Sequence, residues 1–390
     1  MNTAAGIEAT SMGSGDRPDW PQRRLGDLTS AIASGTTRRF TSFGQFPVHG
    51  STGVIGWSNE ADYEGEAILI ARVGANAGAL RQVSGAYGVS DNTIIVRVKE
   101  GISLAYVRRQ LEAKRLNTLI FGSGQPLITG SQIKDLSISL PARAEQDAVS
   151  GVLADVDALL AKLDQLIAKK RDLKQAAMQR LLPGRVRLQG FNGQWEDRSL
   201  ATLGPLLKGR GIRRDQANSG SIACVRYGEI YTTHHDIVRA ITSRISPAVA
   251  ATATRLKRGD ILFAGSGETK EEIGKCVALI DDFDAYAGGD IVILRPRGVD
   301  SRFLGYALNT PEVNRQKANF GQGDAVVHIS AAALGSVTVR LPPLDEQGAI
   351  GTVLTDMDAE LAALETRRDK TRQLKQGMMQ GLLTGRIRLT

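Results

Sequence analysis

Apolar side chains recur at helical spacing in two long stretches of the chain. In the first stretch they are separated by 3, 4, 3 and 4 positions, the heptad spacing of a coiled-coil seam, at Leu153, Val156, Leu160, Leu163 and Ile167. The second stretch repeats this spacing at Leu354, Met357, Leu361 and Leu364. Toward the carboxyl end of each stretch the apolar stripe shifts, to Leu173, Ala177, Leu181 and to Leu374, Met378, Leu382. The pattern predicts two long helices that bury their stripes against each other as an antiparallel coiled coil.

Both helical stretches belong to an internal repeat. Residues 140–189 align with residues 341–390 at a constant offset of 201, without a gap, and about half of the aligned pairs are identical. Each copy starts with a Leu-Pro pair, has Glu145 or Glu346 in its first predicted turn, and ends at a Pro-Gly or Thr-Gly pair, as helices do. A helix from Glu145 to Leu182 would be about 55–60 Å long at the standard rise per residue. The repeat indicates a duplicated protein.

Weaker matches extend the duplication beyond the helices. The pattern after Trp20 matches that after Trp195, and Phe121-Gly122-Ser123-Gly124 matches Phe320-Gly321-Gln322-Gly323. We therefore divide the chain into a tail expected to be disordered (1–19), a first globular domain (20–140), a central long helix (141–189), a second globular domain (190–341) and a C-terminal long helix (342–390). The helices match more closely than the domains. This difference predicts one common partner for the helices and two different targets for the domains.

The two domains have the pattern of mixed α+β folds. Short apolar runs predict strands at Ala67–Val73, Thr93–Val98, Leu136–Leu140, Asp260–Phe263, Cys276–Ile280, Asp290–Leu294 and Val337–Leu341. Helical spacing predicts single helices over Leu104–Leu119 and Phe303–Ala318. The alternation of strands and helices is too irregular for a doubly wound parallel sheet. The fold class is thus α+β, with two similar domains separated by two long helices.

The net charge of +8 is concentrated in two short segments. Lys162–Arg187 and Arg367–Arg388 each carry a net charge of +6, so the rest of the chain is acidic. This clustering predicts a polyanion or an acidic partner nearby, although a solvated helix face explains either segment alone. Aromatic residues make up only 5% of the chain, which argues against platforms that stack the bases of single strands.

The remaining composition narrows the class of protein. Cys224 and Cys276 are the only cysteines, which excludes a disulfide scaffold and a multi-cysteine zinc site and favours a cytoplasmic location. No stretch reaches the roughly 18 apolar residues of a membrane span, and residues 1–19 lack the apolar core of a secretory signal. We expect a globular protein that does not enter a membrane.

Recognisable catalytic motifs are absent from the sequence. Gly265-Ser266-Gly267 lacks the third glycine of a dinucleotide fingerprint, the four histidines show no metal-ligand spacing, and no Gly-x-Ser-x-Gly elbow occurs. Asp260, Glu268 and Lys270 match the carboxylate–lysine set of a Mg²⁺-dependent nuclease loosely, so a stand-alone nuclease stays an alternative. The matching part of the first half has no such trio. We expect no catalytic residue, no metal site and no cofactor bound by this chain.

Several short motifs resemble those of a known family. The motifs are Leu341-Pro-Pro-Leu-Asp-Glu-Gln347, Gln380-Gly-Leu-Leu-Thr-Gly-Arg386, Phe191-Asn-Gly-Gln-Trp195 and Gly122-Ser-Gly-Gln-Pro-Leu-Ile-Thr129. Together with the order domain, helix, domain, helix from about Trp20 to Thr390, they are similar to the specificity subunit of type I restriction–modification enzymes, the HsdS family. The first-half motif Leu140-Pro-Ala-Arg-Ala-Glu-Gln146 departs from the pattern, because it lacks the second proline and the acidic residue before Glu145.

The resemblance implies a non-catalytic role in a larger complex. It implies two target-recognition domains, each reading one half of a split double-stranded DNA target, on an antiparallel helical pair. The helices would dock two methyltransferase subunits, which recruit the restriction subunits. S-adenosylmethionine, ATP and Mg²⁺ are then expected on those partner subunits. An orphan or exchangeable specificity subunit that serves another system's methyltransferase fits the same residues.

Polar loop residues are the candidates for DNA contacts, because the side chains of Arg, Asn and Gln form bidentate bonds with base edges while others anchor phosphates. We select Arg38, Arg39, Arg72, Asn92 and Gln125 in the first domain and Arg213, Arg214, Arg226, Lys270 and Gln322 in the second. The domains differ most in these loops, which predicts an asymmetric bipartite target. Helix length would set the unread spacer, at about one DNA turn (~34 Å) or more. The alternative of a coiled-coil protein that binds no DNA predicts no salt-dependent DNA affinity.

Overall fold

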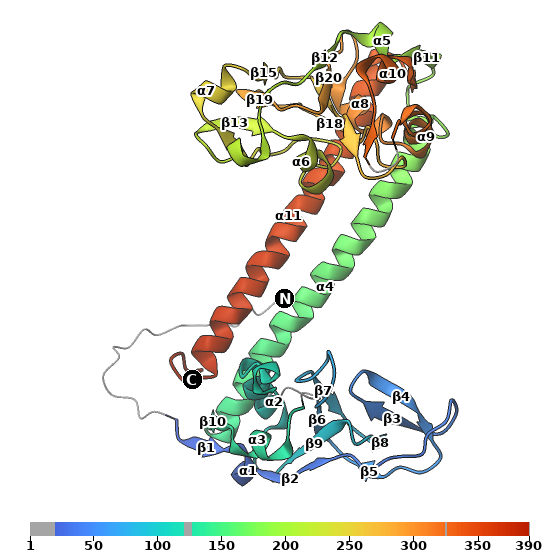
Figure 1. Cartoon of the computed structure of the whole chain (residues 1–390). Coiled ribbons are helices and arrows are strands. Elements are labelled where there is room, and N and C mark those ends of the chain that lie inside the picture. Colours follow the sequence, from blue (N-terminus) through green and yellow to red (C-terminus); the bar gives the residue numbers. More distant parts are fainter. Residues whose placement is uncertain (1–19, 121–126, 324–325, 390) are drawn as a thin grey trace, which may run out of the picture. The chain divides into compact units, whose positions relative to one another are not determined.

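The computed structural model describes residues 20–120, 127–323 and 326–389 and divides into two compact units (Figure 1). Unit 1 contains the chain up to Asp164 together with Thr366–Thr390, and unit 2 contains Gln165–Glu365. Each unit therefore holds one globular domain and one part of each long helix. The tail 1–19 and Gln125 lie outside the described residues, so nothing tests the predictions made for them.

The globular domain of unit 1 is built on two four-stranded sheets. One sheet has the order β2-β9-β6-β7 and is antiparallel, and the other has the order β4-β3-β8-β5 with a parallel β3·β8 pair. Strand β1 pairs with β10 beside the helices. The elements are β1 (Gln22–Arg24), α1 (Leu25–Leu28), β2 (Thr29–Ser34), β3 (Phe46–Gly50), β4 (Gly53–Ser58), β5 (Tyr63–Glu64), β6 (Ala67–Ala71), β7 (Leu80–Val83), β8 (Ala86–Val89), β9 (Thr93–Val98), α2 (Leu104–Ala113), η1 (Leu116–Leu119), α3 (Gly130–Asp135) and β10 (Ser137–Ser139).

The globular domain of unit 2 repeats the strand order of both four-stranded sheets and adds a two-stranded sheet of β17 and β21. Its sheets have the orders β12-β20-β16-β18 and β14-β13-β19-β15, the second with a parallel β13·β19 pair, and β11 pairs with β22. The elements are β11 (Glu196–Ser199), α5 (Leu200–Leu203), β12 (Leu206–Lys208), η2 (Arg214–Gln216), β13 (Ile222–Val225), α6 (Tyr227–Thr232), β14 (Arg244–Ile245), α7 (Pro247–Ala250), β15 (Thr254–Arg255), β16 (Ile261–Ala264), β17 (Ser266–Gly267), β18 (Cys276–Ala278), β19 (Ala285–Ala287), β20 (Ile291–Leu294), α8 (Ser301–Ala307), α9 (Pro311–Phe320), β21 (Val327–His328), α10 (Ala331–Ser336) and β22 (Thr338–Leu341). The duplicated α+β fold is thereby confirmed.

The continuous apolar runs of the sequence are strands buried on both faces. In β6, Ile68 and Ile70 point into one hydrophobic cluster, whereas Ala67 and Leu69 point into another. Alternate side chains of a strand point to opposite faces, so a sheet covered on both sides needs apolar residues at every position. This explains why the strands read as unbroken apolar runs without polar alternation.

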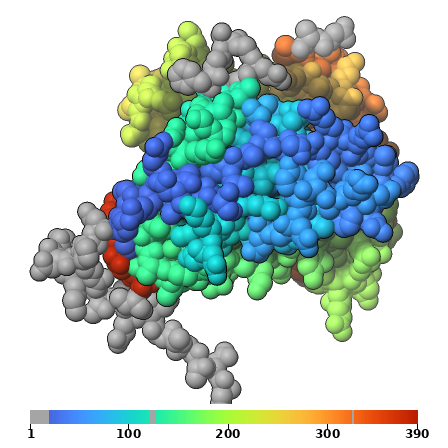
Figure 2. All heavy atoms as spheres, turned by 90° about the horizontal axis from the view of Figure 1, so that it is seen from below, coloured from blue at the N-terminus to red at the C-terminus, as the bar shows by residue number. Residues whose placement is uncertain are grey.

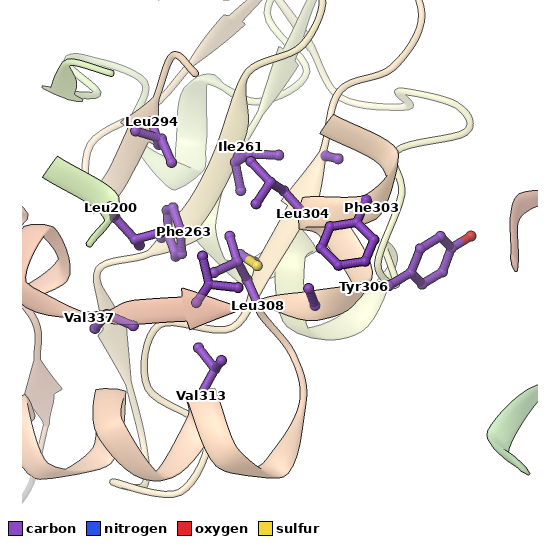
Figure 3. Packing of buried hydrophobic residues seen from close by; sticks show 14 of the residues in the cluster. Leu200, Ile261, Phe263, Leu294, Phe303, Leu304, Tyr306, Leu308, Val313 and Val337 are labelled. Carbon is purple, nitrogen blue, oxygen red and sulfur yellow. The ribbon is translucent and has the colours of Figure 1, made fainter. Parts of the chain in front are cut away.

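Strand β16 shows the same division in unit 2. Ile261 and Phe263 pack into a large cluster with Leu304, while Leu262 and Ala264 face the second sheet (Figure 3). Figure 3 also shows that the ring of Tyr306 lies at the edge of this cluster with its hydroxyl pointing away from the apolar side chains. The hydroxyl is therefore available to a polar partner outside the core.

The long helices α4 (Arg143–Leu181) and α11 (Leu344–Leu382) have 39 residues each, which corresponds to about 58 Å. Within each unit their segments are antiparallel. In unit 1, Asp157 bonds Lys375 and Asp164 bonds Arg372, so the numbers rise on one helix and fall on the other. None of the helices in the described residues is apolar over a length that would cross a bilayer.

The predicted shift of the apolar stripe is confirmed at Leu181 and Leu382, which are buried, and is wrong at its first residues, Leu173 and Leu374. Leu173 is 47% exposed and Leu374 is 60% exposed, although both belong to a helix that buries other leucines. The seam is instead continued by Lys174 and Lys375, one position further along, which reach acidic groups of the globular domains. Because these lysines turn toward the domain, the leucines before them turn outward.

Two predicted helices are interrupted in the structure. The helix expected over Phe303–Ala318 is two helices, α8 and α9, because Pro311 has no N–H to continue α8 and starts α9 instead. The helix expected over Leu104–Leu119 ends at Ala113 and is followed by a short 3₁₀ turn. Arg115 between them has φ = 48°, in the left-handed region, where a helix cannot continue.

Candidate nucleic-acid interface

Two equivalent loops leave the sheets at a glycine that no other residue could replace. After β2, a Cβ on Gly35 would lie 2.3 Å from the carbonyl oxygen of Val89. After β12, a Cβ on Gly209 would lie 2.0 Å from the carbonyl oxygen of Gly288. The backbone of each loop thus crosses directly over the turn that precedes the central strand of its own sheet. The two loops start from the same place in the two copies of the fold.

Each of these loops carries an Arg-Arg pair. Arg38 and Arg39 follow Gly35 closely, and Arg213 and Arg214 follow Gly209, and all four arginines are exposed. None of them forms an ion pair with a described residue. A guanidinium without a partner, on a loop fixed at its base, is suited to bidentate bonds with base edges or phosphates. The sequence selected all four arginines, and the structure shows that the pairs are equivalent.

A second equivalent feature lies beside each loop. In unit 1 the N–H of Arg72 donates to the carbonyl of Asn92 at 3.1 Å, and in unit 2 the N–H of Gly265 donates to the carbonyl of Asp290 at 2.7 Å. Asn92 and Asp290 each lie in the turn before the central strand β9 or β20. The exposed side chain of Asn92 is therefore placed near the Arg38–Arg39 loop, and Asp290 holds the equivalent position in unit 2.

Two of the selected arginines make bonds within their domains. The guanidinium of Arg72 donates to the hydroxyl of Ser34 at 2.7 Å and to the carbonyl of Ile128 at 3.3 Å. Arg226 caps α6 with its N–H on the carboxylate of Glu229 at 2.9 Å, and its Nε lies 3.7 Å from the same group. These contacts favour a role in fixing the loops over a direct contact with bases.

The two remaining candidates of unit 2 lie on one edge of the domain. Lys270 is exposed in the loop between β17 and β18, and Gln322 is exposed just after α9. The backbone of Gln322 exchanges two hydrogen bonds of 2.9 and 2.8 Å with His328, whose strand β21 pairs with β17. Gln125 and most of the motif Gly122–Thr129 lie outside the described residues.

The structure also shows site residues that the sequence did not indicate. Ile212 has φ = 54° and Asp290 has φ = 59°, which is unusual for residues other than glycine and a genuine outlier for a β-branched side chain. Ile212 is only 7% exposed and packs with Cys224 and Ala250. It anchors the loop from which Arg213 and Arg214 project. Strained backbone of this kind concentrates at functional sites. Sequence spacing contains no signal for it.

A lysine at the end of the helical pair fixes the domain of unit 1. Nζ of Lys375 lies 2.8 Å from Asp157 on α4 and 3.3 Å from Glu112 on α2, and Arg109 reaches Asp157 at 2.6 Å. Burial alone would raise the pKa of Asp157, but the hydrogen bonds from Lys375 and Arg109 outweigh it and hold this pKa below its usual value. The domain is therefore tied to both helices by charges at neutral pH.

In unit 2 the equivalent lysine, Lys174, also connects the globular domain to the other long helix. Nζ of Lys174 lies 2.7 Å from Asp358 on α11 and 3.3 Å from Asp236 of the globular domain. The hydroxyl of Tyr306, which points out of the core in Figure 3, donates to Asp358 at 2.6 Å. Burial and this neighbouring carboxylate raise the pKa of Tyr306, so the phenol stays protonated as the donor. Lys174 and Lys375 are 201 residues apart and belong to the repeat.

A third repeated contact is an ion pair between an arginine that follows the end of one long helix and a glutamate in the first turn of the other. Arg187 bonds Glu346 at 2.5 Å with its guanidinium 5.6 Å from the Trp195 ring centre, and Arg388 bonds Glu145 at 2.6 Å near Trp20. Other cations of the basic segments also bond acids of this chain, namely Lys170 with Glu360, Arg171 with Glu365 and Arg372 with Asp164. Much of the clustered positive charge therefore stabilises the helical pair.

The nuclease constellation does not form around Asp260. This residue is fully buried, and Arg295 donates to both of its carboxylate oxygens at 2.8 Å, while the N–H of Lys257 donates to one of them. The negative charge of this carboxylate is already paired with the Arg295 guanidinium inside the domain, which argues against a role in holding a metal ion. No group of three possible metal ligands occurs within the described ranges, whereas Glu268 and Lys270 are exposed on a loop.

The fold and the loops define a duplicated protein with two equivalent, divergent recognition domains. The family model described as the type I restriction modification DNA specificity domain matches residues 18–169 and 192–375. The chain therefore belongs to this family, and its role is to supply DNA sequence specificity. Each match covers one globular domain and most of the long helix that follows it.

Individual relatives agree with the family assignment. The chain is 27% identical over 114 residues to the type I restriction enzyme EcoprrI specificity subunit of Escherichia coli, which covers 29% of this chain and 28% of that protein. It is 21% identical over 344 residues to the type I restriction enzyme MjaVIII specificity subunit of Methanocaldococcus jannaschii, which covers 83% of this chain and 79% of that protein.

Two solved structures share the fold. One is the S subunit of a type I restriction–modification system from M. genitalium, with a TM-score of 0.66, 14% identity and coverage of 95% of this chain and 98% of that chain. The other comes from a structure of complex assembly in the type I restriction–modification system, with a TM-score of 0.54, 16% identity and the same coverage. At these identities the likeness concerns the fold.

Proposed function

We propose that each globular domain reads one half of an asymmetric bipartite DNA target, within a complex whose chemistry is carried out by other subunits. The observation that carries this proposal is the equivalence of the two loops. Arg38–Arg39 and Arg213–Arg214 leave the same point of the same fold, yet the residues around them differ. Equivalent scaffolds with different loop residues read different base sequences in the major groove.

Two methyltransferase subunits are the proposed partners, and restriction subunits would join through them. Leu173 in unit 2 and Leu374 in unit 1 support this proposal, because they are equivalent residues of the repeat and both are exposed. Exposed leucines at repeated positions of a helix are suited to bind two copies of one partner. S-adenosylmethionine, ATP and Mg²⁺ would then be bound by the partners. That the helix length sets the spacer stays a prediction.

A map of methylated bases in the native host, with and without this gene, tests the proposed function. We expect one split motif to disappear on deletion, with two unequal half-sites around a fixed spacer. If the chain is an exchangeable subunit, the motif returns when the chain is expressed with another system's methyltransferase. A purified complex with no methylation of any split motif and no salt-dependent DNA affinity would favour a coiled-coil protein without DNA binding.

Substitution of the exposed leucines tests the proposed partners. In Leu173→Glu or Leu374→Glu, a charge replaces the apolar contact, so each single variant should retain one methyltransferase subunit and the double variant none. Native mass spectrometry of the complex gives this stoichiometry directly. Gln175→Glu is the matched control, since it adds the same charge two positions from Leu173 and should retain both subunits. Two methyltransferases on the double variant would place the docking surface elsewhere.

A further inference from the structure

The loop that carries Arg38 and Arg39 is held rigidly against strand β4. Thr41 exchanges two backbone hydrogen bonds with Trp57, at 2.8 and 2.9 Å, so the loop adds a short strand-like segment to the sheet. The hydroxyl of Thr41 accepts from the N–H of Phe43 at 3.3 Å. A Cβ on Gly44 would lie 2.7 Å from the backbone of Ser58, so the chain touches β4 again there. The residue between these contacts has a defined position.

That residue, Phe43, is 84% exposed, the highest value among the large apolar side chains of the described residues. Its neighbour Phe40 packs its ring against Gly56 and is 42% exposed, so it supports the loop from below. Figure 2 shows one face of unit 1, much of which is formed by the N-terminal segments drawn in blue. A single exposed apolar residue needs no explanation, but this one has a fixed position on the same loop as Arg38 and Arg39, which form no ion pair with a described residue.

We propose that Phe43 contacts the C5-methyl group of a thymine in the half-site read by the first domain. Apolar side chains distinguish thymine in the major groove through this methyl group, while adjacent arginines bind phosphates or guanine edges. The equivalent loop of unit 2 has no such residue, because its apolar side chain, Ile212, is buried at 7% exposure. The inference rests on the proposed function and extends it to one base pair of one half-site.

Replacement of thymine by deoxyuridine tests the inference, since it removes only the methyl group. The probes are duplexes that contain the split motif from the methylation map, with each thymine of both half-sites replaced in turn, bound to the complex of this chain with its methyltransferase. We expect one position in one half-site to weaken binding about fourfold, the value for one buried methyl group. Phe43→Ala should weaken binding of the unmodified duplex by at least as much and remove the sensitivity to deoxyuridine at that position.

Two further variants make the result specific. Phe43→Leu keeps an apolar contact and should retain the sensitivity to deoxyuridine, whereas Val54→Ala, another exposed apolar residue of the same domain, should leave it unchanged. The inference is overturned if the half-site read by the first domain contains no A·T pair. It is also overturned if the effect of deoxyuridine on binding persists in Phe43→Ala. In both cases specific binding of the split motif would still support the proposed function. If the unmodified complex binds no split motif, the proposed function itself fails.

Discussion

Replacing Arg213 and Arg214 together by alanine should remove specific recognition of one half-site and leave the fold intact. Each bidentate contact of an arginine with a base is worth about 1–3 kcal/mol of discrimination, so the double variant should lose a factor of at least about 30. Both side chains are exposed and form no ion pair within the described residues, so their removal costs the fold little. The measurement is the ratio of specific to non-specific affinity of the complex at one salt concentration.

Arg297→Ala is the matched control for this prediction. Arg297 is exposed in the same domain but follows the opposite end of β20 from the Asp290 turn. It should change non-specific affinity slightly and specificity not at all. The equivalent double variant Arg38→Ala with Arg39→Ala should damage recognition of the other half-site. An unchanged specificity ratio in both double variants would show that the Arg-Arg loops do not read DNA, whichever other residues do.

Asp260→Ala should produce the largest loss of stability of any single substitution considered. Asp260 is fully buried, its carboxylate accepts two bonds from Arg295, and the bond raises the pKa of that guanidinium. Removing the carboxylate deletes its hydrogen bonds with Arg295 and Lys257, and the remaining guanidinium is 26% exposed and so partly hydrated, which gives a cost of about 1.5–3 kcal/mol. For a domain of this size that corresponds to a fall of about 3–12 °C in the midpoint of thermal unfolding.

Asp284→Ala provides a control of the same chemistry in the same domain. Asp284 bonds Arg255 at 3.1 Å, but the two side chains are 70% and 68% exposed, and exposed pairs contribute at most about 1 kcal/mol. Thermal denaturation of the full chain compares the two variants. Equal midpoints would contradict the structural role of Asp260. Mg²⁺-dependent DNA cleavage by the wild-type chain, lost in Asp260→Asn, would instead revive the nuclease alternative.

Local sequence patterns were sufficient to predict many of the strands, the two long helices and the internal duplication. Strand β9 occupies Thr93–Val98 as the apolar run predicts, and α4 matches the helix predicted from Glu145 to Leu182 within two residues at each end. The wider helical segments 141–189 and 342–390 each extend eight residues beyond the end of their helix. Such elements depend on spacing and on local signals such as Pro141 and Gly184, which the sequence contains directly. The wrong prediction of one helix over Phe303–Ala318 also has a local cause, because the apolar period continues across Pro311 although the proline starts a new helix.

Only some of the candidate DNA-contact residues could be predicted from local sequence patterns. Residue type and loop position selected Arg38–Arg39 and Arg213–Arg214 without indicating that they occupy equivalent loops. The same criteria selected Arg72, whose donors are used by Ser34 and Ile128 within the domain. They did not select Phe43, because an apolar residue in a polar loop has no spacing signal and its exposure is a property of the folded chain.

The sequence by itself determined that this protein is a duplication of a domain and a long helix, because repeats and periods are carried along the chain. Only the tertiary structure decided what the charges do. Lys174 bonds Asp358, and Asp260 bonds Arg295, across separations that no local pattern specifies. The cause is physical: burial and pairing depend on which distant segments the fold brings within hydrogen-bond distance, and that choice is made by the packing of both faces of the sheets.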